Sequence, residues 1–281
     1  MGILNINDDS FSSDGKLDPS WAKKRAIELI LDGADVIDVG AESARTNREA
    51  ISIDEEIARF RGFLEQWGKV VEESKPRDEE QLWPPLLSVN TWRTEVIREL
   101  VQDGQVDLVN DMSAMQDEKN AVLCRDFKKG LLLMHSVGVP KISHTHVKWT
   151  DVVSSCYEFF DEKLRWCREL EVPEESLILD PGFGFAKSAE DDRRLLASLE
   201  KLHYFGRPLL VPVGRKGFLG ETLNISDPKE LDAATIGALS IACRREAHLY
   251  RVHDVRACFE ALKVLTVLPS CGNGTPSMVN S

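Results

Sequence analysis

Short apolar runs that end in polar residues recur eight times along the chain. In the first, residues 2–12, Ile3, Leu4 and Ile6 alternate with amides, carboxylates and hydroxyls, which cannot be buried without hydrogen-bond partners. The same design recurs in segments 36–43, 86–91, 108–111, 131–136, 177–185, 209–216 and 249–254. We therefore predict eight strands, each of which delivers chemically capable side chains at its C-terminal end.

Segments with the apolar spacing of helices lie between these strands. They cover residues 22–31, 57–64, 92–103, 115–128, 149–170, 189–202, 228–244 and 254–267. Alternating strands and helices are typical of parallel α/β folds, and right-handed crossovers can close such a sheet. We predict a single-domain (β/α)8 TIM barrel over residues 1–268, with its site at the C-terminal strand ends. An open doubly wound sheet is the alternative, although its usual glycine-rich first turn is absent.

The connecting segments suggest which end of the barrel carries the site. The long loops 7–17, 41–53 and 136–148 follow strands, which places them at the catalytic face. Segment 73–85 precedes a strand and is predicted to be a solvated turn on the opposite face. The tail 269–281, rich in small and polar residues, is expected to be disordered.

The composition limits the classes of binding partner and the cellular compartments that suit this protein. A net charge of −12 argues against nucleic acid or an anionic membrane as a partner. The six cysteines are scattered without a C-x-x-C pair, which favours reduced, structural thiols. No apolar run approaches membrane-spanning length, and acidic residues follow the first strand at once, unlike a signal peptide. We expect a cytoplasmic protein.

Two basic clusters follow the last two predicted strands. Alternation places Arg251 and His253 on one side of the final strand, where both can face a single anion. Gly214, Arg215 and Lys216 follow the strand before it, and phosphate sites often form between these two strands of a barrel. The clusters predict a phosphorylated substrate; a surface ion pair with a helix-capping histidine is the simpler alternative.

A second constellation has acceptors suited to a planar heterocycle. Asp180 ends an apolar run just before Pro181, and a buried carboxylate there can accept two hydrogen bonds from an amidine-like edge. Asn110 and Asp111 on the fourth strand could contact the same ring. The alternative for Asp180 is a helix cap.

Other polar residues have plainer interpretations. His144 and His146, with His135, could form a transition-metal site, but a pair of loop histidines fits their spacing better. His135 ends a strand and is a further candidate to face the site. Glu55, Glu56 and the charge run 188–194 are interpreted as solvated helix faces.

In order and spacing, these motifs resemble the dihydropteroate synthase family over nearly the whole chain. The matching stretches are Gly-Ile-Leu-Asn-Ile-Asn-Asp-Asp-Ser-Phe-Ser, Gly-Ala-Asp-Val-Ile-Asp-Val-Gly-Ala-Glu-Ser-Ala-Arg, Val-Asn-Asp, Leu-Met-His, Leu-Asp-Pro-Gly-Phe-Gly-Phe, Gly-Arg-Lys and Arg-Val-His-Asp. The resemblance implies a TIM-barrel transferase, usually a homodimer, that makes a folate precursor. Such enzymes join 6-hydroxymethyl-7,8-dihydropterin diphosphate to p-aminobenzoate and release diphosphate, with Mg²⁺ present.

The resemblance also implies a role for each matching residue. Asn5 would hold Mg²⁺ or the diphosphate, which Arg251 and His253 would grip. Asp180 and Asn110 would bind the pterin edge, and Lys216 would lie against the pterin and the second substrate. The catalytic residues implied are Asp180, Lys216 and Asn90, with Asn90 also at the pterin. The loops at the second substrate would contribute Asp9, Ser10, Phe11, Arg45, Gly214 and Arg215.

The sequence departs from the family pattern in four of its motifs. Asn7-Asp8 replaces Thr-Pro, and Ser43-Ala44-Arg45-Thr46 replaces Ser-Thr-Arg-Pro. Asn90 replaces an aspartate, and Gly214 replaces a serine associated with the p-aminobenzoate carboxylate. These changes leave open a paralogue that binds the pterin but uses another acceptor or has lost synthase activity. A pterin-dependent methyltransferase fits less well, since methyl transfer needs no diphosphate site.

Overall fold

The computed structural model describes residues 1–7, 15–43, 49–138, 140–142, 144 and 146–268. Within these ranges, strands and helices alternate from the N-terminus onward. The strands are β1 (Gly2–Asn5), β2 (Val36–Gly40), β3 (Leu86–Thr91), β4 (Leu108–Asp111), β5 (Gly130–Met134), β6 (Leu177–Asp180), β7 (Leu210–Val211) and β8 (Leu249–Tyr250). The α-helices are α1 (Pro19–Leu31), α2 (Ile53–Glu73), α3 (Thr94–Val101), α4 (Lys119–Asp126), α5 (Val152–Glu169), α6 (Ala189–Ala197), α7 (Gly217–Leu223), α8 (Asp232–Arg244) and α9 (Val255–Val267).

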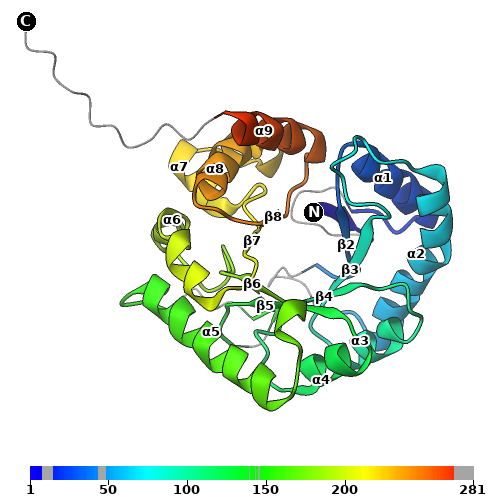
Figure 1. The fold of residues 1–281 in the computed structure, drawn as a ribbon, viewed down its shortest axis with the longest axis horizontal. Coiled ribbons are helices and arrows are strands. Elements are labelled where there is room, and N and C mark those ends of the chain that lie inside the picture. Colours follow the sequence, from blue (N-terminus) through cyan, green and yellow to red (C-terminus); the bar gives the residue numbers. More distant parts are fainter. Residues whose placement is uncertain (8–14, 44–48, 139, 143, 145, 269–281) are drawn as a thin grey trace, which may run out of the picture.

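The strands close into a parallel barrel surrounded by helices (Figure 1). β1 to β6 pair in sequence order, and β7 pairs with β8. Two parallel bridges join these sheets, one between Leu179 and Leu209 and one between Gly2 and Val252. The second bridge brings the two ends of the barrel order together, which confirms the predicted TIM barrel and excludes the open doubly wound sheet.

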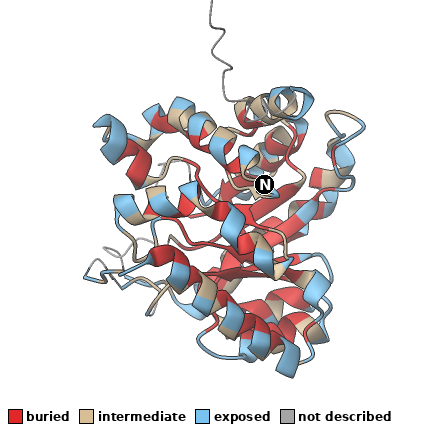
Figure 2. Cartoon of the chain, turned by 60° about the vertical axis from the view of Figure 1, so that its left-hand side comes forward, coloured by how far each residue is buried: buried red, intermediate tan, exposed pale blue. Residues whose placement is uncertain are grey.

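Apolar side chains fill two separate layers. The large layer lies between the strands and the helices, and the helices carry their exposed residues on the outside (Figure 2). A small cluster of Leu108, Met112, Leu132, Met134 and Leu210 fills the barrel interior. Because successive strand residues face opposite sides, residues two positions after members of this cluster also point inward. On β4 the inward residue after Leu108 is Asn110, so the interior changes from apolar to polar toward the C-terminal strand ends.

Several element boundaries differ from the predicted ones. β7 forms ladder pairs over two residues, because Pro212 has no N–H with which to extend the ladder. The segment predicted as a helix over 189–202 becomes a 3-10 helix from Leu199, and the one over 228–244 begins as a 3-10 turn at Pro228. α7 was missed in the sequence because two glycines in its seven residues lower its helix propensity.

Segment 73–85 lies at the N-terminal strand ends, as predicted, since the Leu82 N–H bonds the Asp35 carboxylate just before β2. It is not wholly solvated, however. The buried Gln81 amide donates to the carbonyls of Ile30 and Ala34 and so fastens the segment to α1.

Two general findings concern the described residues. None of their helices is both long and apolar enough to cross a membrane. The five described cysteines are free thiols, four of them buried.

Candidate active site

Polar side chains from neighbouring strands meet in the barrel interior at the C-terminal strand ends. The strand register aligns Asn5 with Gly40, Gly40 with Asn90, and Asn90 with Asn110. Gly40 leaves space in this row, because a Cβ there would lie 3.6 Å from Asn5 Oδ1. The structure thus brings together the predicted site residues of the first, third and fourth strands.

Asp38 on β2 lies at the centre of this arrangement and is fully buried. Its carboxylate accepts hydrogen bonds from Ser88 Oγ at 2.6 Å, Asn90 Nδ2 at 3.4 Å and Asn110 Nδ2 at 3.2 Å. It also forms an ion pair with Arg251, in which Nε lies 2.6 Å from Oδ2. The sequence prediction missed Asp38. Alternation along β2, which points residues 36, 38 and 40 inward, was the signal that could have found it.

Asp180 ends β6 and is buried, and its Oδ1 accepts the Gly182 N–H at 2.7 Å. Burial raises the pKa of Asp180 to about 6, although Lys216, Lys187 and Arg251 act to lower it. At neutral pH the carboxylate is therefore mostly ionised and surrounded by cations. That is the state needed to accept hydrogen bonds from a ring that carries N–H groups.

Lys216 follows β7 and reaches the Asp180 side of the barrel. Its Nζ donates to the Phe183 carbonyl at 2.7 Å and lies 5.0 Å from the centre of the Phe185 ring. Burial lowers the pKa of Lys216 to about 8, while Asp180 acts to raise it. A cation beside an aromatic ring and a carboxylate can pack against the face of a flat heterocycle.

Lys187 is a second residue beside Asp180 that the sequence analysis missed. Its buried Nζ donates to the carbonyls of His135, Gly182 and Phe185 at 3.1, 2.9 and 3.0 Å. These bonds fix the turn that begins at Asp180. Gly182 has φ +71°, and a Cβ there would lie 2.0 Å from the His135 carbonyl oxygen, so only glycine fits this turn.

The basic residues at the last two strands divide into two environments. Arg251 turns inward to Asp38, and His253 lies beside Gly214, where a Cβ would come 3.4 Å from His253 Cδ2. Arg215 instead forms a bidentate ion pair with Asp232 of α8, at 2.7 and 2.9 Å. Arg215 therefore attaches its loop to α8, whereas Lys216 of the same cluster is close enough to Arg251 for the two charges to interact.

Two residues that were predicted to face the site, Asp111 and His135, do not do so. Asp111 points outward, where its carboxylate bonds Ser113 and Asn120 rather than a ring in the barrel. His135 is buried beside the rings of Trp149 and Phe159 and does not face the site.

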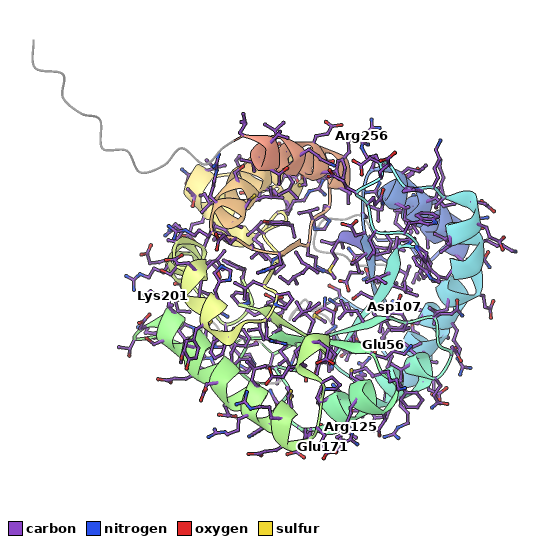
Figure 3. All side chains as sticks on the ribbon, in the orientation of Figure 1. Glu56, Asp107, Arg125, Glu171, Lys201 and Arg256 are labelled. Atoms are coloured by element: carbon purple, nitrogen blue, oxygen red, sulfur yellow. The ribbon has the colours of Figure 1, made fainter. Side chains whose placement is uncertain are left out.

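Glu56 and Asp192 are buried, whereas both were assigned to solvated helix faces. Glu56 lies inside the ring of helices in Figure 3, in contrast to Lys201 and Arg256 at its outer edge. Its carboxylate pairs with Arg93, and that of Asp192 accepts the Gly184 N–H at 3.0 Å. Amphipathic spacing alone could not reveal these partners, because they come from other elements.

The loop histidines do not complete a transition-metal site within the described residues. The rings of His144 and His146 lie 6.0 Å apart, and no cluster of three His, Cys, Asp or Glu side chains in the described ranges could hold a metal ion. Of the predicted second-substrate residues, Asp9, Ser10, Phe11 and Arg45 lie outside the described residues.

Buried carboxylates and amides thus lie beside an inward-facing arginine in the barrel interior, and the comparisons with known proteins assign this barrel to the class of pterin-binding enzymes. The family model described as pterin binding enzyme matches residues 1–253. Dihydropteroate synthase of Escherichia coli K12 is 36% identical over 94% of this chain and 89% of its own length.

Solved structures show the same relation. Dihydropteroate synthase of Yersinia pestis, in a sulfonamide complex, has a TM-score of 0.83 and 30% identity over 95% of this chain and 92% of its own. The Xanthomonas albilineans enzyme with 4-aminobenzoic acid has a TM-score of 0.81 and 30% identity over 96% and 93%. The chain belongs to the dihydropteroate synthase family and is a transferase.

Proposed function

We propose that the chain condenses 6-hydroxymethyl-7,8-dihydropterin diphosphate with p-aminobenzoate and releases diphosphate. One observation carries the proposal: the buried acceptors Asp180 and Asp38 face the same barrel interior as Arg251. A pterin offers an amidine-like edge of N–H donors, and a diphosphate ester adds anionic oxygens at the other end of the molecule. The site supplies complementary groups for both parts of the substrate.

The pterin ring would lie across the polar row of the barrel. Asp180 would accept from the donor edge, and Asn110 would supply its amide oxygen, because its Nδ2 is already bonded to Asp38. Asn90 is oriented in the same way by Asp38, so its oxygen also faces the ring site. Lys216 and Phe185 would bound the ring on the side of β7.

The diphosphate would lie at the ends of β1 and β8. Arg251 bonds Asp38 through Nε, which leaves its terminal guanidinium nitrogens for phosphate oxygens, and His253 adds a donor two residues on. An amide oxygen at Asn5 suits Mg²⁺, which binds proteins through few ligands and completes its shell with substrate phosphates and water. The described residues fit such a site. The ion would neutralise charge on the departing diphosphate.

The reaction is displacement at the pterin methylene. The C–O bond to diphosphate breaks, and positive charge develops on the methylene and ring. The arylamine nitrogen then forms the new C–N bond and loses a proton to water. The buried, ionised Asp180 stabilises the developing cation electrostatically, and Lys216 holds the ring in position.

The second substrate would enter over the loops that follow β1, β2 and β7. The Xanthomonas albilineans relative, whose solved complex holds 4-aminobenzoic acid, supports this acceptor. Arg45, Asp9, Ser10 and Phe11 remain expectations from the resemblance, as does Gly214.

A different acceptor is the second candidate, and Gly214 favours it. A Cβ at this position would lie 3.1 Å from the Arg251 carbonyl oxygen. The serine of the family pattern would need the neighbouring strand to shift slightly, so the backbone here is built around glycine. A missing hydrogen-bond group costs about 1–3 kcal/mol of binding.

The proposed assembly is a cytoplasmic homodimer. Apolar residues Ile241 of α8 and Val264 and Val267 of α9 are exposed, which suits a surface shared by two copies. The five free thiols among the described residues fit a reducing compartment. Analytical ultracentrifugation of the purified chain would test the dimer.

The function is tested by incubating the purified chain with pterin diphosphate, Mg²⁺ and p-aminobenzoate. We expect dihydropteroate and one equivalent of diphosphate. Asp180→Asn should lose at least tenfold in pterin affinity by calorimetry, since about 1.4 kcal/mol is tenfold. Asp111→Asn is the matched control, because Asp111 is a buried strand-end carboxylate that points outward. Pterin binding without product would support the other acceptor, and equal losses in both variants would place the ring elsewhere.

A further inference from the structure

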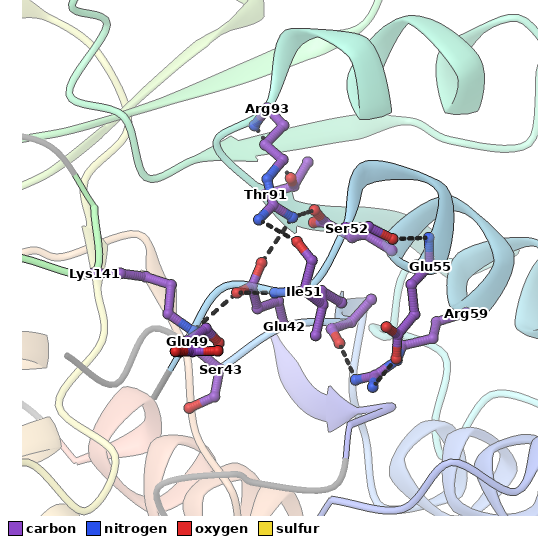
Figure 4. A network of polar contacts seen from close by, with 12 residues as sticks. Glu42, Ser43, Glu49, Ile51, Ser52, Glu55, Arg59, Thr91, Arg93 and Lys141 are labelled. Atoms are coloured by element: carbon purple, nitrogen blue, oxygen red, sulfur yellow. Dashed lines mark hydrogen bonds and ion pairs between the residues drawn. The ribbon is translucent and has the colours of Figure 1, made fainter. Parts of the chain in front are cut away.

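Lys141, in the loop after β5, reaches across the catalytic face to the loop after β2. Its Nζ lies 2.8 Å from Glu42 Oε1 and donates to the carbonyls of Ser43 and Glu49, each at 3.2 Å (Figure 4). The side chain is only 9% exposed. One ammonium group therefore holds both ends of the stretch between residues 43 and 49.

Glu42 extends this contact into the body of the barrel. Its Oε1 also accepts the Ile51 N–H at 3.2 Å, and its Oε2 pairs with Arg93 Nη1 at 2.7 Å. Arg93 in turn pairs with the fully buried Glu56 of α2. Two cations and two carboxylates form a balanced, largely buried network, in which loss of one cation leaves an uncompensated negative charge.

The backbone conformation of Lys141 is independent evidence that this residue is held in place. Its φ is +64°, a left-handed conformation that L-residues other than glycine, asparagine and aspartate seldom adopt. Such a conformation persists only where surrounding contacts over-determine it, and it is enriched at functional sites. The three contacts of the Lys141 ammonium, with Glu42, Ser43 and Glu49, supply that determination.

We infer that Lys141 is a positioning residue that holds the loop after β2 in place for the second substrate. This inference rests on the proposed function, in which the loop 41–53 contacts p-aminobenzoate. The pterin site lies on other residues: Asp180, Asn110 and Lys216 make no described contact with this network. Loss of Lys141 therefore weakens use of the arylamine while pterin binding stays intact.

The first test measures hydrogen exchange over residues 41–53 in the full chain. We expect Lys141→Met to raise exchange there by about tenfold, because the variant loses the ion pair and both hydrogen bonds that the ammonium makes to this loop. Lys128→Met is the matched control, because Lys128 is also left-handed, at φ +54°, yet exposed and outside the network. Lys141→Arg should recover most of the protection. Exchange in Lys141→Met equal to that of the parent chain would overturn the inference.

The second test separates the two substrates. In Lys141→Met, KM for p-aminobenzoate should rise about tenfold, while pterin diphosphate affinity by calorimetry should stay within about twofold. Equal losses for both substrates would mean that Lys141 is merely structural, and would overturn the inference. If Lys141→Met does not fold, Lys141→Gln, which removes the charge but keeps a donor, carries the same expectation. A parent chain that makes no dihydropteroate overturns the proposed function, while the exchange measurement still decides whether Lys141 holds the loop.

Discussion

Replacing Asp38 with asparagine should damage both halves of the substrate site at once. The carboxylate is fully buried and serves Ser88, Asn90, Asn110 and Arg251 together. An asparagine keeps one acceptor oxygen and brings an N–H₂ group toward donors that already point at it. Asn110 would lose its orientation toward the pterin, and Arg251 would lose its fixed place at the diphosphate.

The size of the loss expected for Asp38→Asn follows from the burial of the Asp38–Arg251 ion pair. Removing one member of a buried ion pair costs about 3–5 kcal/mol. The lower end applies here, because the Arg251 side chain is 20% exposed and keeps some hydration. An equal loss of transition-state binding, from the misplaced Asn110 and Arg251, would lower kcat/KM by roughly a hundredfold. In a chain of this size, a loss of about 3 kcal/mol in stability corresponds to a fall of about 6 °C in Tm.

The assay is kcat/KM for the pterin diphosphate at saturating p-aminobenzoate, together with thermal melts. Asp35→Asn is the matched control. Asp35 lies three residues earlier at the other end of β2, and its carboxylate accepts the Leu82 N–H outside the polar row. We expect that variant to keep its kcat/KM within about twofold. Unchanged kcat/KM in Asp38→Asn, or an equal loss in the control, would refute a central role for Asp38.

Two further predictions concern charge in the same site. Asn90→Asp places a second carboxylate about 3.4 Å from the first. The repulsion between the two carboxylates, up to roughly 4 kcal/mol, raises the folded-state pKa of one of them above its unfolded value. The variant therefore loses folding stability as the pH rises from about 4 to 7, because ionisation is easier in the unfolded chain. Turnover should nonetheless rise about fivefold, because the new charge faces the developing cation; a pH-independent change in Tm, or a fall in turnover, would contradict this account. The kcat/KM for the pterin diphosphate should fall below pH about 6, as Asp180 is protonated, and above about 8, as Lys216 loses its proton. Lys216→Met should remove the upper limb of that profile, and a surviving limb would assign it to another group.

The barrel fold and the polar character of its C-terminal strand ends could be predicted from the sequence. Apolar runs that end in polar residues, separated by helical spacing, admit few other folds, because each strand must bury one face against helices and the other inside the barrel. Strand alternation and the order of the motifs also predicted that Asn110, Asp180, Lys216 and Arg251 lie at the C-terminal strand ends, where the structure has them. They could be predicted because each stands at or shortly after the end of an apolar run, which is a local feature of the sequence.

The partners of these residues could not be predicted from the sequence, because they come from distant segments of the chain. Asp38 draws its partners from β3, β4 and β8, up to 213 positions away in the chain. Asp111 and Arg215 carry the same chemistry as Asp180 and Arg251, but contacts with Asn120 and Asp232 turn them outward. Glu56 was predicted to be solvated, but it is buried against Arg93, which precedes α3. A side chain's role depends on which groups satisfy its charge and hydrogen bonds, and closing the barrel supplies those groups from distant segments.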